Sequence, residues 1–372
     1  MSSIISDSTS IEKVAQKRSE IALKFALIAI GPLLLLGLLE GSAYFWEQRQ
    51  SNGLYAWEMV ASRRLELISY LEPVPGYTLM KPGSRFEWQG IPVEVNSHGL
   101  RGGEIGYENP ENTFRILNLG DSVAMGWGVS AEDTYGQQLE ALLNQRATGG
   151  LQYEVINAGV PGWNLENELA YLQAEGLKFR PDLVLLDLTI VNDIYGKSAL
   201  SKNDRPALFE WLRTNTYFWP FLTVQLRWME ARATGRARID VIDPPSKADS
   251  YFPLDPDAEK WSEIWGWISK MNDLATESGA DFTVLLFPLE FQVIDDQFST
   301  LPQDVFKSRA AEAGIRVVDL LPVFREACLN KPGGSCFRED RYLFADVWMH
   351  PSAYGHEITA VELIENLDGR IR

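Results

Sequence analysis

One serine and one histidine carry the chemistry that this sequence suggests. Ser122 stands in the Gly-Asp-Ser triplet that ends the apolar segment 113–119, and His350 stands in DVWMHPSAYGHEI (346–358), which opens with Asp346. A serine hydroxyl is a weak nucleophile near neutral pH and needs an adjacent base, which an imidazole oriented by a carboxylate supplies. These residues therefore predict acyl transfer at Ser122, with His350 as the base and Asp346 as its orienting acid.

Such residues must be held by a regular framework, and the chain supplies one from residue 113 onward. Strand-like and helix-like segments alternate, and the strand-like segments are continuously apolar, which is typical of a parallel sheet covered by helices on both faces. This pattern predicts a three-layer α/β core. The further strands are expected at 153–159, 181–193, 281–288 and 316–321, and the helices at 131–146, 164–179, 259–279, 304–314 and 351–367.

Four short blocks resemble those of the SGNH, or GDSL-type, hydrolases over about 113–368. The blocks are GDS (120–122), INAGVPGWN (156–164), TIVND (189–193) and DVWMHPSAYGH (346–356). The resemblance implies a flavodoxin-like α/β fold, in which motifs after separate strands meet at one edge of the sheet. It also implies a role for five residues: Ser122 as nucleophile and oxyanion donor, Gly159 and Asn192 as further oxyanion donors, His350 as base and Asp346 as acid.

Two positions depart from the family pattern. Ile190 stands where the third block usually has glycine, two residues before the asparagine. The acid usually stands three residues before the histidine, whereas Asp346 stands four before His350. Asp340 or a backbone carbonyl is therefore an alternative partner for the imidazole.

Further side chains near these blocks have structural and functional interpretations. Asp121 is expected to fix the turn around the nucleophile by accepting backbone N–H groups. His356, on the closing helix, is expected to be structural, and His98 is a turn residue or borders the site. Trp127 and Trp163 either wall the acyl or alcohol pocket or fill the core.

The amino-terminal part of the chain contains an apolar run, FALIAIGPLLLLGLL (25–39), which predicts a transmembrane helix over 21–46. Basic residues precede the run and acidic residues follow it, so the amino terminus is expected in the cytoplasm and the bulk of the chain outside. A signal peptide cleaved near Gly41-Ser42-Ala43 is the alternative. The basic residues are Lys13, Lys17, Arg18 and Lys24.

The remaining segments complete the predicted domain organisation. Residues 1–20 form a polar cytoplasmic tail, and 47–112 form a juxtamembrane neck in which alternation over 85–95 predicts a hairpin. An insertion at about 195–256 interrupts the α/β pattern. Its aromatic-rich part, 207–233, is a lid, a membrane-leaning surface, a sugar platform or a small core of its own.

Composition and cysteine usage narrow the partners and the compartment. A formal net charge of -17 argues against nucleic acid as a partner, because phosphate binding depends on clusters of Lys and Arg. Cys328 and Cys336 flank a Pro-Gly-Gly turn and are candidates for a local disulfide, which would indicate an oxidising compartment; the alternative is two reduced thiols. Their spacing does not fit a zinc site.

Together these observations predict a single-pass, membrane-anchored serine esterase of the cell envelope that needs neither metal nor cofactor. Its substrate is an acyl or acetyl ester, with a glycan or a lipid as the second component. One alternative is an O-acyltransferase or deacetylase acting on an envelope polysaccharide. The other is a non-catalytic envelope scaffold on a degenerate hydrolase fold.

Overall fold

The computed structural model describes most of the chain from residue 71 onward and a short helical stretch before it. The described residues are 30–32, 34–45, 71–88, 90–190, 193, 208–209, 211–212, 216–219, 221–223, 226, 229, 252–332, 342–345 and 349–367. The chain divides into two units by its internal contacts. One unit comprises 1–63 and 205–233, and the other comprises 64–204 and 234–372.

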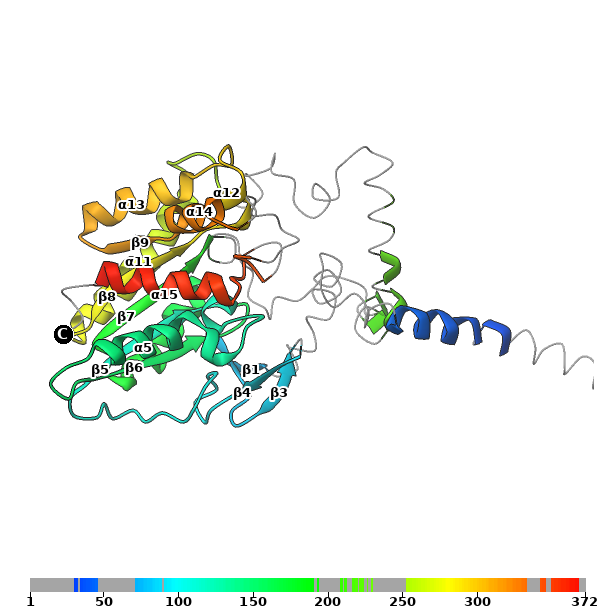
Figure 1. The fold of residues 1–372 in the computed structure, drawn as a ribbon, viewed down its shortest axis with the longest axis horizontal. Helices are drawn as coiled ribbons and strands as arrows, with labels where there is room; N and C mark the ends of the chain where they lie inside the picture. Colours follow the sequence, from blue (N-terminus) through cyan, green and yellow to red (C-terminus); the bar gives the residue numbers. More distant parts are fainter. Residues whose placement is uncertain are drawn as a thin grey trace, which may run out of the picture. The chain divides into compact units, whose positions relative to one another are not determined.

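A five-stranded parallel sheet forms the centre of the larger unit (Figure 1). Nearly every residue of its three central strands is buried, because helices cover both faces, and this explains their continuously apolar sequences. The α/β prediction is confirmed. In spatial order the strands are β6 (Gln152–Gly159), β5 (Thr113–Gly120), β7 (Leu183–Thr189), β8 (Asp281–Phe287) and β9 (Arg316–Asp319).

Helices form the two outer layers. Helices α5 (Tyr135–Arg146) and α15 (Ala353–Leu367) pack against each other on the face that is nearer in Figure 1. Right-handed crossovers place α6 (Leu165–Ala174) and α11 (Glu259–Glu277) together on the opposite face. There α11 contacts α13 (Leu301–Ala313) through edge-to-face rings.

The order of the strands determines where a site can form. The chain moves from β5 outward to β6 and then crosses back to β7 on the other side of β5. Loops that leave neighbouring strands in opposite directions open a crevice at the carboxyl edge of the sheet. The segment that follows β5 begins with Asp121 and Ser122, so the predicted nucleophile lies at this reversal point.

Two antiparallel hairpins precede the sheet in sequence. Strands β1 (Leu71–Val74) and β2 (Tyr77–Met80) form the first. Strands β3 (Arg85–Trp88) and β4 (Ile91–Glu94) form the second, where the alternating pattern predicts a hairpin.

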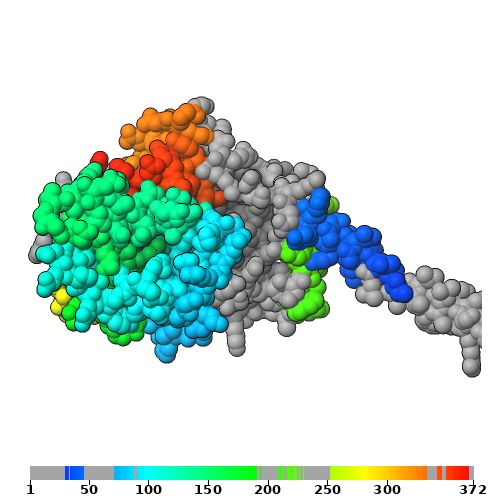
Figure 2. Space-filling view, turned by 60° about the horizontal axis from the view of Figure 1, so that its bottom comes forward, coloured from blue at the N-terminus to red at the C-terminus, as the bar shows by residue number. Residues whose placement is uncertain are grey.

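The described part of the predicted neck packs onto the α/β core. The Trp163 indole N–H donates to the Thr78 carbonyl at 2.8 Å, and the Asn167 side-chain amide donates to the Gly76 carbonyl at 2.9 Å. Tyr77 and Met80 are buried at this contact region. In Figure 2 the surface of residues 71–112, in blue to cyan, continues onto that of the core. Residues 71–112 therefore belong to the same unit as the site.

The smaller unit joins the amino-terminal helix to the insertion. The described residues 30–32 and 34–45 are helical, and the Glu40 carboxylate accepts the backbone N–H groups of Tyr217 and Phe218. The rings of Tyr44 and Tyr217 pack edge to face, with centroids 5.0 Å apart. The aromatic-rich insertion is thus in contact with the amino-terminal helix within this unit.

Within the described ranges, no helix combines the length and apolar composition that a bilayer crossing requires. Residues 21–29, 33 and 46 of the predicted span lie outside these ranges. The transmembrane helix stays a prediction.

Candidate active site

Ser122, the predicted nucleophile, lies at the start of a very short helix directly after β5. Asp121 is the N-cap of α4 (Ser122–Met125), and its carboxylate accepts the Val123 N–H at 2.7 Å. This is the turn-fixing contact expected of Asp121. Ser122 is 4% exposed, so its hydroxyl lies at the base of the crevice rather than on the open surface.

His350 comes within hydrogen-bond distance of this serine from 228 residues away. Its Nε2 lies 2.8 Å from the Ser122 Oγ. The loop that carries His350 is closed by a hydrogen bond from the Ala345 N–H to the His350 carbonyl at 2.8 Å. The distance is that of a nucleophile with its general base.

The Trp127 ring packs flat against the imidazole of His350. The indole and imidazole rings have centroids 5.1 Å apart and an interplanar angle of 17°. Trp127 is half-buried. Of the two tryptophans considered for the pocket, this one therefore borders the nucleophile and the base.

Trp163, the other candidate, does not line the site in this way. It is 1% exposed and packs against Tyr77 and Tyr171, while its N–H bonds to Thr78. Of the two alternatives for Trp163, pocket wall or core, the structure places it in the core, where Tyr77 and Thr78 of the β1–β2 hairpin contact the ring.

Gly159 lies close to the nucleophile, but its N–H group is already used. It donates to the Asn157 Oδ1 at 3.0 Å. The glycine is required for a different reason: a Cβ at this position would lie 2.2 Å from the backbone nitrogen of Met125. The structure therefore corrects the prediction of an oxyanion donor to a residue that lets β6 approach the nucleophile turn.

The backbone N–H groups of Ser122 and Gly162 have no acceptor among the described residues. In the loop after β6, the Val160 N–H donates to the Gly120 carbonyl and the Trp163 N–H donates to the Val160 carbonyl. Residue 161 is a proline and has no N–H. Gly162 has a positive φ of 79°. The Pro-Gly turn was the sequence signal that could have identified this donor.

Three predicted site or disulfide residues lie outside the described ranges: Asn192, Asp346 and Cys336. The alternative acid Asp340 is outside them as well. Cys328 is half-buried in α14 (Leu321–Leu329). The third oxyanion donor, the acid partner of His350 and the disulfide stay predictions.

The other histidines have structural surroundings. The His98 Nε2 lies 2.9 Å from the Ile105 carbonyl, and its ring packs on Tyr107. The His356 Nδ1 accepts the Tyr135 N–H at 3.2 Å, at the start of α5. Burial, with Arg101 nearby, lowers the pKa of His356 to about 3, so this ring is neutral at physiological pH.

Ile190, which replaces the expected glycine, is completely buried immediately after β7. Its side chain is therefore part of the core. Beside it, the carboxylate of Asp193 accepts the Thr189 N–H at 2.6 Å.

Three of the buried carboxyl groups near Ser122, those of Glu168, Asp187 and Asp193, were not identified from the sequence. Asp121, Glu168, Asp187 and Asp193 are all at most 3% exposed. Burial and mutual repulsion raise the pKa of Glu168, Asp187 and Asp193 well above the ordinary range. Tyr135 donates its hydroxyl to Asp187 at 2.9 Å. The one sequence signal was Asp187, an acidic residue inside the apolar strand β7.

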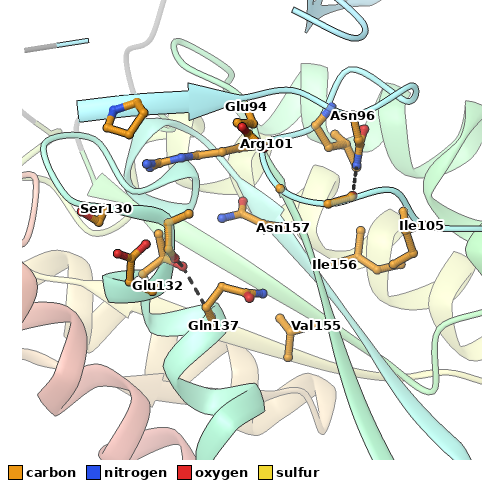
Figure 3. Close-up of a pocket in the computed structure, with 16 residues that line it drawn as sticks. Glu94, Asn96, Arg101, Ile105, Ser130, Glu132, Gln137, Val155, Ile156 and Asn157 are labelled. Atoms are coloured by element: carbon orange, nitrogen blue, oxygen red, sulfur yellow. Dashed lines mark hydrogen bonds between the residues drawn. The ribbon is translucent and has the colours of Figure 1, made fainter. Parts of the chain in front are cut away.

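A cavity of about 380 Å³ lies beside the nucleophile turn (Figure 3). Its lining residues come from the segments after β4, before α5 and at the end of β6, and include Arg101 and Asn157. Neither Ser122 nor His350 lines it. In the described part of the chain, no three His, Cys, Asp or Glu side chains are grouped to hold a metal ion.

A serine within hydrogen-bond distance of an imidazole, at the carboxyl edge of a parallel sheet, is the arrangement found in α/β serine hydrolases. The profile of the GDSL-like Lipase/Acylhydrolase family matches residues 119–358. This match covers more than half of the chain, and the chain belongs to that family. No match to a curated protein was found.

Solved structures with a similar fold share little sequence with this chain. TesA is 16% identical, with 69% of this chain and 99% of TesA covered and a TM-score of 0.41. A catalytic mutant of Axe2, an acetylxylan esterase from Geobacillus stearothermophilus, is 16% identical, with coverages of 70% and 96% and a TM-score of 0.41. A member of the lipolytic G-D-S-L family from Veillonella parvula DSM 2008 is 15% identical, with coverages of 68% and 97% and a TM-score of 0.38.

Proposed function

We propose that this protein is a serine ester hydrolase in which Ser122 attacks the carbonyl carbon of a carboxylic ester. The observation that carries the proposal is the 2.8 Å contact between the Ser122 Oγ and the His350 Nε2. A non-catalytic scaffold has no need to keep two residues 228 positions apart at this distance. Membership of an acylhydrolase family supports the same chemistry.

The proposed reaction has two halves. His350 takes the hydroxyl proton as Ser122 attacks, and it returns that proton to the departing alcohol, which leaves an acyl-serine. Water, deprotonated by the same imidazole, then releases the acid. The charge on the tetrahedral oxygen is held by the N–H groups of Ser122 and Gly162 and, from the family resemblance, by the Asn192 amide; one such donor is worth about 3 kcal/mol.

We further propose that the chain is anchored in a membrane through residues 21–46, with the α/β unit on the outer side. The apolar run and the basic residues before it support this placement. An envelope ester, carried on a glycan or a lipid, is then the substrate within reach.

Replacement of the nucleophile tests the proposed chemistry. Ser122→Ala should lower the turnover of p-nitrophenyl acetate by more than about 10⁴-fold, because the attacking atom is lost. A fluorophosphonate probe should label the wild type and leave the variant unlabelled. The melting temperatures should agree within a few degrees, since only one hydroxyl is removed. Equal turnover by the two proteins would exclude Ser122 as the nucleophile.

A further inference from the structure

A buried arginine from the segment after β4 holds the segment that contains the nucleophile. We call residues 121–129 the nucleophile loop. The Arg101 Nη1 donates to the carbonyls of Met125 at 3.1 Å and Gly126 at 2.8 Å, and its Nη2 donates to the carbonyl of Val129 at 2.9 Å. One side chain thus binds both the end of α4 and the end of the nucleophile loop.

The carbonyls of Met125 and Gly126 lie where the helix ends, and that of Val129 lies just after the turn that follows. Carbonyls in the last turn of a helix have no partner within the helix, and α4 ends at Gly126, at a positive φ of 86°. Met125, Gly126 and Val129 are buried, so water does not replace a missing donor. A cation is also the favourable charge at a helix carboxyl end.

Arg101 is itself held in place by a compact turn. The Asn96 Oδ1 accepts the N–H groups of His98 at 2.9 Å and Leu100 at 3.1 Å, and its amide donates to the Gly103 carbonyl at 3.0 Å. The backbones of Val95 and Arg101 pair across this turn. Arg101 is 5% exposed, and burial lowers its pKa to about 10, which leaves it charged at neutral pH.

A second side chain supports the nucleophile loop from the same cavity. The Asn157 amide donates to the Ala124 carbonyl at 2.9 Å. Figure 3 shows Arg101 extended along one side of the cavity with Asn157 beside it. Carbonyls of four residues in the loop are therefore bound by two side chains from outside it.

The nucleophile loop also carries the contacts of the base. Trp127, which stacks on His350, lies between Gly126 and Val129, two of the three residues whose carbonyls Arg101 binds. A Cβ at Gly128 would lie 3.1 Å from the Cβ of Ala345, so the loop also meets the loop of the base. A shift of the nucleophile loop would thus move Ser122 and Trp127 together relative to the imidazole.

We infer that Arg101 is a positioning residue, which fixes the distance between Ser122 and His350 by binding the carbonyls of the nucleophile loop. This inference rests on the proposed function of Ser122. A reactive group displaced by about 1 Å loses on the order of 100-fold in rate. Removing Arg101 should therefore lower the rate of the chemical step and leave substrate binding largely unchanged.

Arg115 provides a matched control in the same unit. It is 1% exposed and also binds backbone carbonyls, those of Gly106, Tyr107, Glu108 and Phe179. It lies near the start of β5, whereas Ser122 follows the end of that strand. Its loss removes hydrogen bonds to four backbone carbonyls, together with the ion pair that Arg115 forms with Glu154, without touching the nucleophile loop.

The test compares Arg101→Met, Arg101→Lys and Arg115→Met with the wild-type chain. The kcat and KM for p-nitrophenyl acetate and the rate of fluorophosphonate labelling are measured below the melting temperature of each protein. We expect Arg101→Met to lower kcat and the labelling rate by about 10- to 100-fold at an unchanged KM. The kcat and labelling rate of Arg101→Lys should lie between those of Arg101→Met and the wild type, because lysine keeps the charge but donates to fewer carbonyls. Arg115→Met should keep its kcat.

The outcomes separate this inference from the proposed function. Arg101→Met with wild-type kcat would overturn the positioning role, and so would an equal loss in Arg115→Met. If Arg101→Met fails to fold, a wild-type kcat in Arg101→Lys would overturn the role, and a reduced kcat at unchanged KM would support it. A wild-type chain that is not labelled at Ser122 would remove the proposed function itself.

Discussion

At the residue scale, Trp127 stands out among the described side chains because it contacts His350, the proposed base. Its ring lies nearly parallel to the imidazole, which becomes positively charged in the proposed acyl transfer. An aromatic face stabilises a cation by about 0.5–2 kcal/mol, depending on exposure. The flat contact also limits rotation of the imidazole away from Ser122.

Trp127→Leu should lower kcat for p-nitrophenyl acetate by about 2- to 30-fold, which is the same energy range expressed as a rate. Trp127→Phe should lose less, because a smaller aromatic face remains. The measurement is kcat and KM for both variants, with melting temperatures to confirm folding. A change in KM alone would show that Trp127 contacts substrate without supporting the base.

The chemistry-bearing residues were easier to predict than the groups that serve them. Ser122 and His350 stand in short motifs, and the strand pattern before Ser122 already indicates exposure at a strand end. Gly159 was misassigned because a backbone N–H has no signature of its own in sequence. Its availability depends on an Asn157 side chain two residues earlier, and the residue type does not reveal that contact. Arg101 was missed because its partners are carbonyls 24 to 28 residues away.

At the scale of elements, helix α6 brings a carboxyl group into the core. Glu168 is completely buried, and neither side-chain oxygen has a hydrogen-bond partner among the described residues. Burial, and then repulsion from Asp193 and Asp121, raises the pKa of Glu168 well above the ordinary 4.5. A buried carboxyl group without a partner is retained at a cost in stability.

The direction of the pH effect follows from proton binding. Above about pH 4.5 the unfolded chain has released the Glu168 proton, whereas the folded chain still holds it. The folded state therefore binds more protons, and its stability decreases as the pH rises from 4.5 through the pKa of the folded state. Glutamine has nearly the same shape and no charge to bury.

Glu168→Gln should therefore raise the melting temperature at pH 8 and have a much smaller effect near pH 4.5. Each kcal/mol added to the free energy of unfolding raises the melting temperature by about 2–4 °C in a domain of this size. Melting curves at several pH values measure the difference. The control is Glu166→Gln on the same helix, where the side chain is exposed and no such trend is expected. A variant less stable than the wild type at every pH would contradict this account.

At the scale of the whole molecule, the sheet could be predicted from the sequence. The contacts made by the segments outside the sheet could not. Continuous apolar strands identify a parallel sheet, because burial on both faces leaves no polar alternation. The alternation over 85–95 indicates a buried face without naming what covers it. It also says nothing of the contacts that Thr78 and Gly76, in the other hairpin, make with the α/β core. The contact between Glu40 and the insertion was equally hidden, since it joins segments 177 residues apart.

The anchoring prediction also belongs to the whole molecule, because it decides which side of a membrane the active site faces. An apolar run enters a bilayer with its more basic flank on the cytoplasmic side. The flank before 25–39 holds Lys13, Lys17, Arg18 and Lys24, whereas the flank after it holds Glu40, Glu47 and the single basic residue Arg49. The same charge difference that orients the helix would export the α/β unit, where Cys328 and Cys336 could pair.

Fusions at the carboxyl terminus of the full chain, produced in a bacterium, measure this orientation. Alkaline phosphatase fused after Arg372 should be active, because it folds only outside the cytoplasm, and green fluorescent protein at the same position should be dark. The fusion should stay in the membrane pellet after alkaline carbonate washing at its full mass, whereas cleavage near Gly41-Ser42-Ala43 would release a shorter soluble chain. Replacing Lys13, Lys17, Arg18 and Lys24 with glutamine should lower phosphatase activity, since the orienting charge is removed. A fluorescent wild-type fusion would place the active site in the cytoplasm and contradict an envelope substrate.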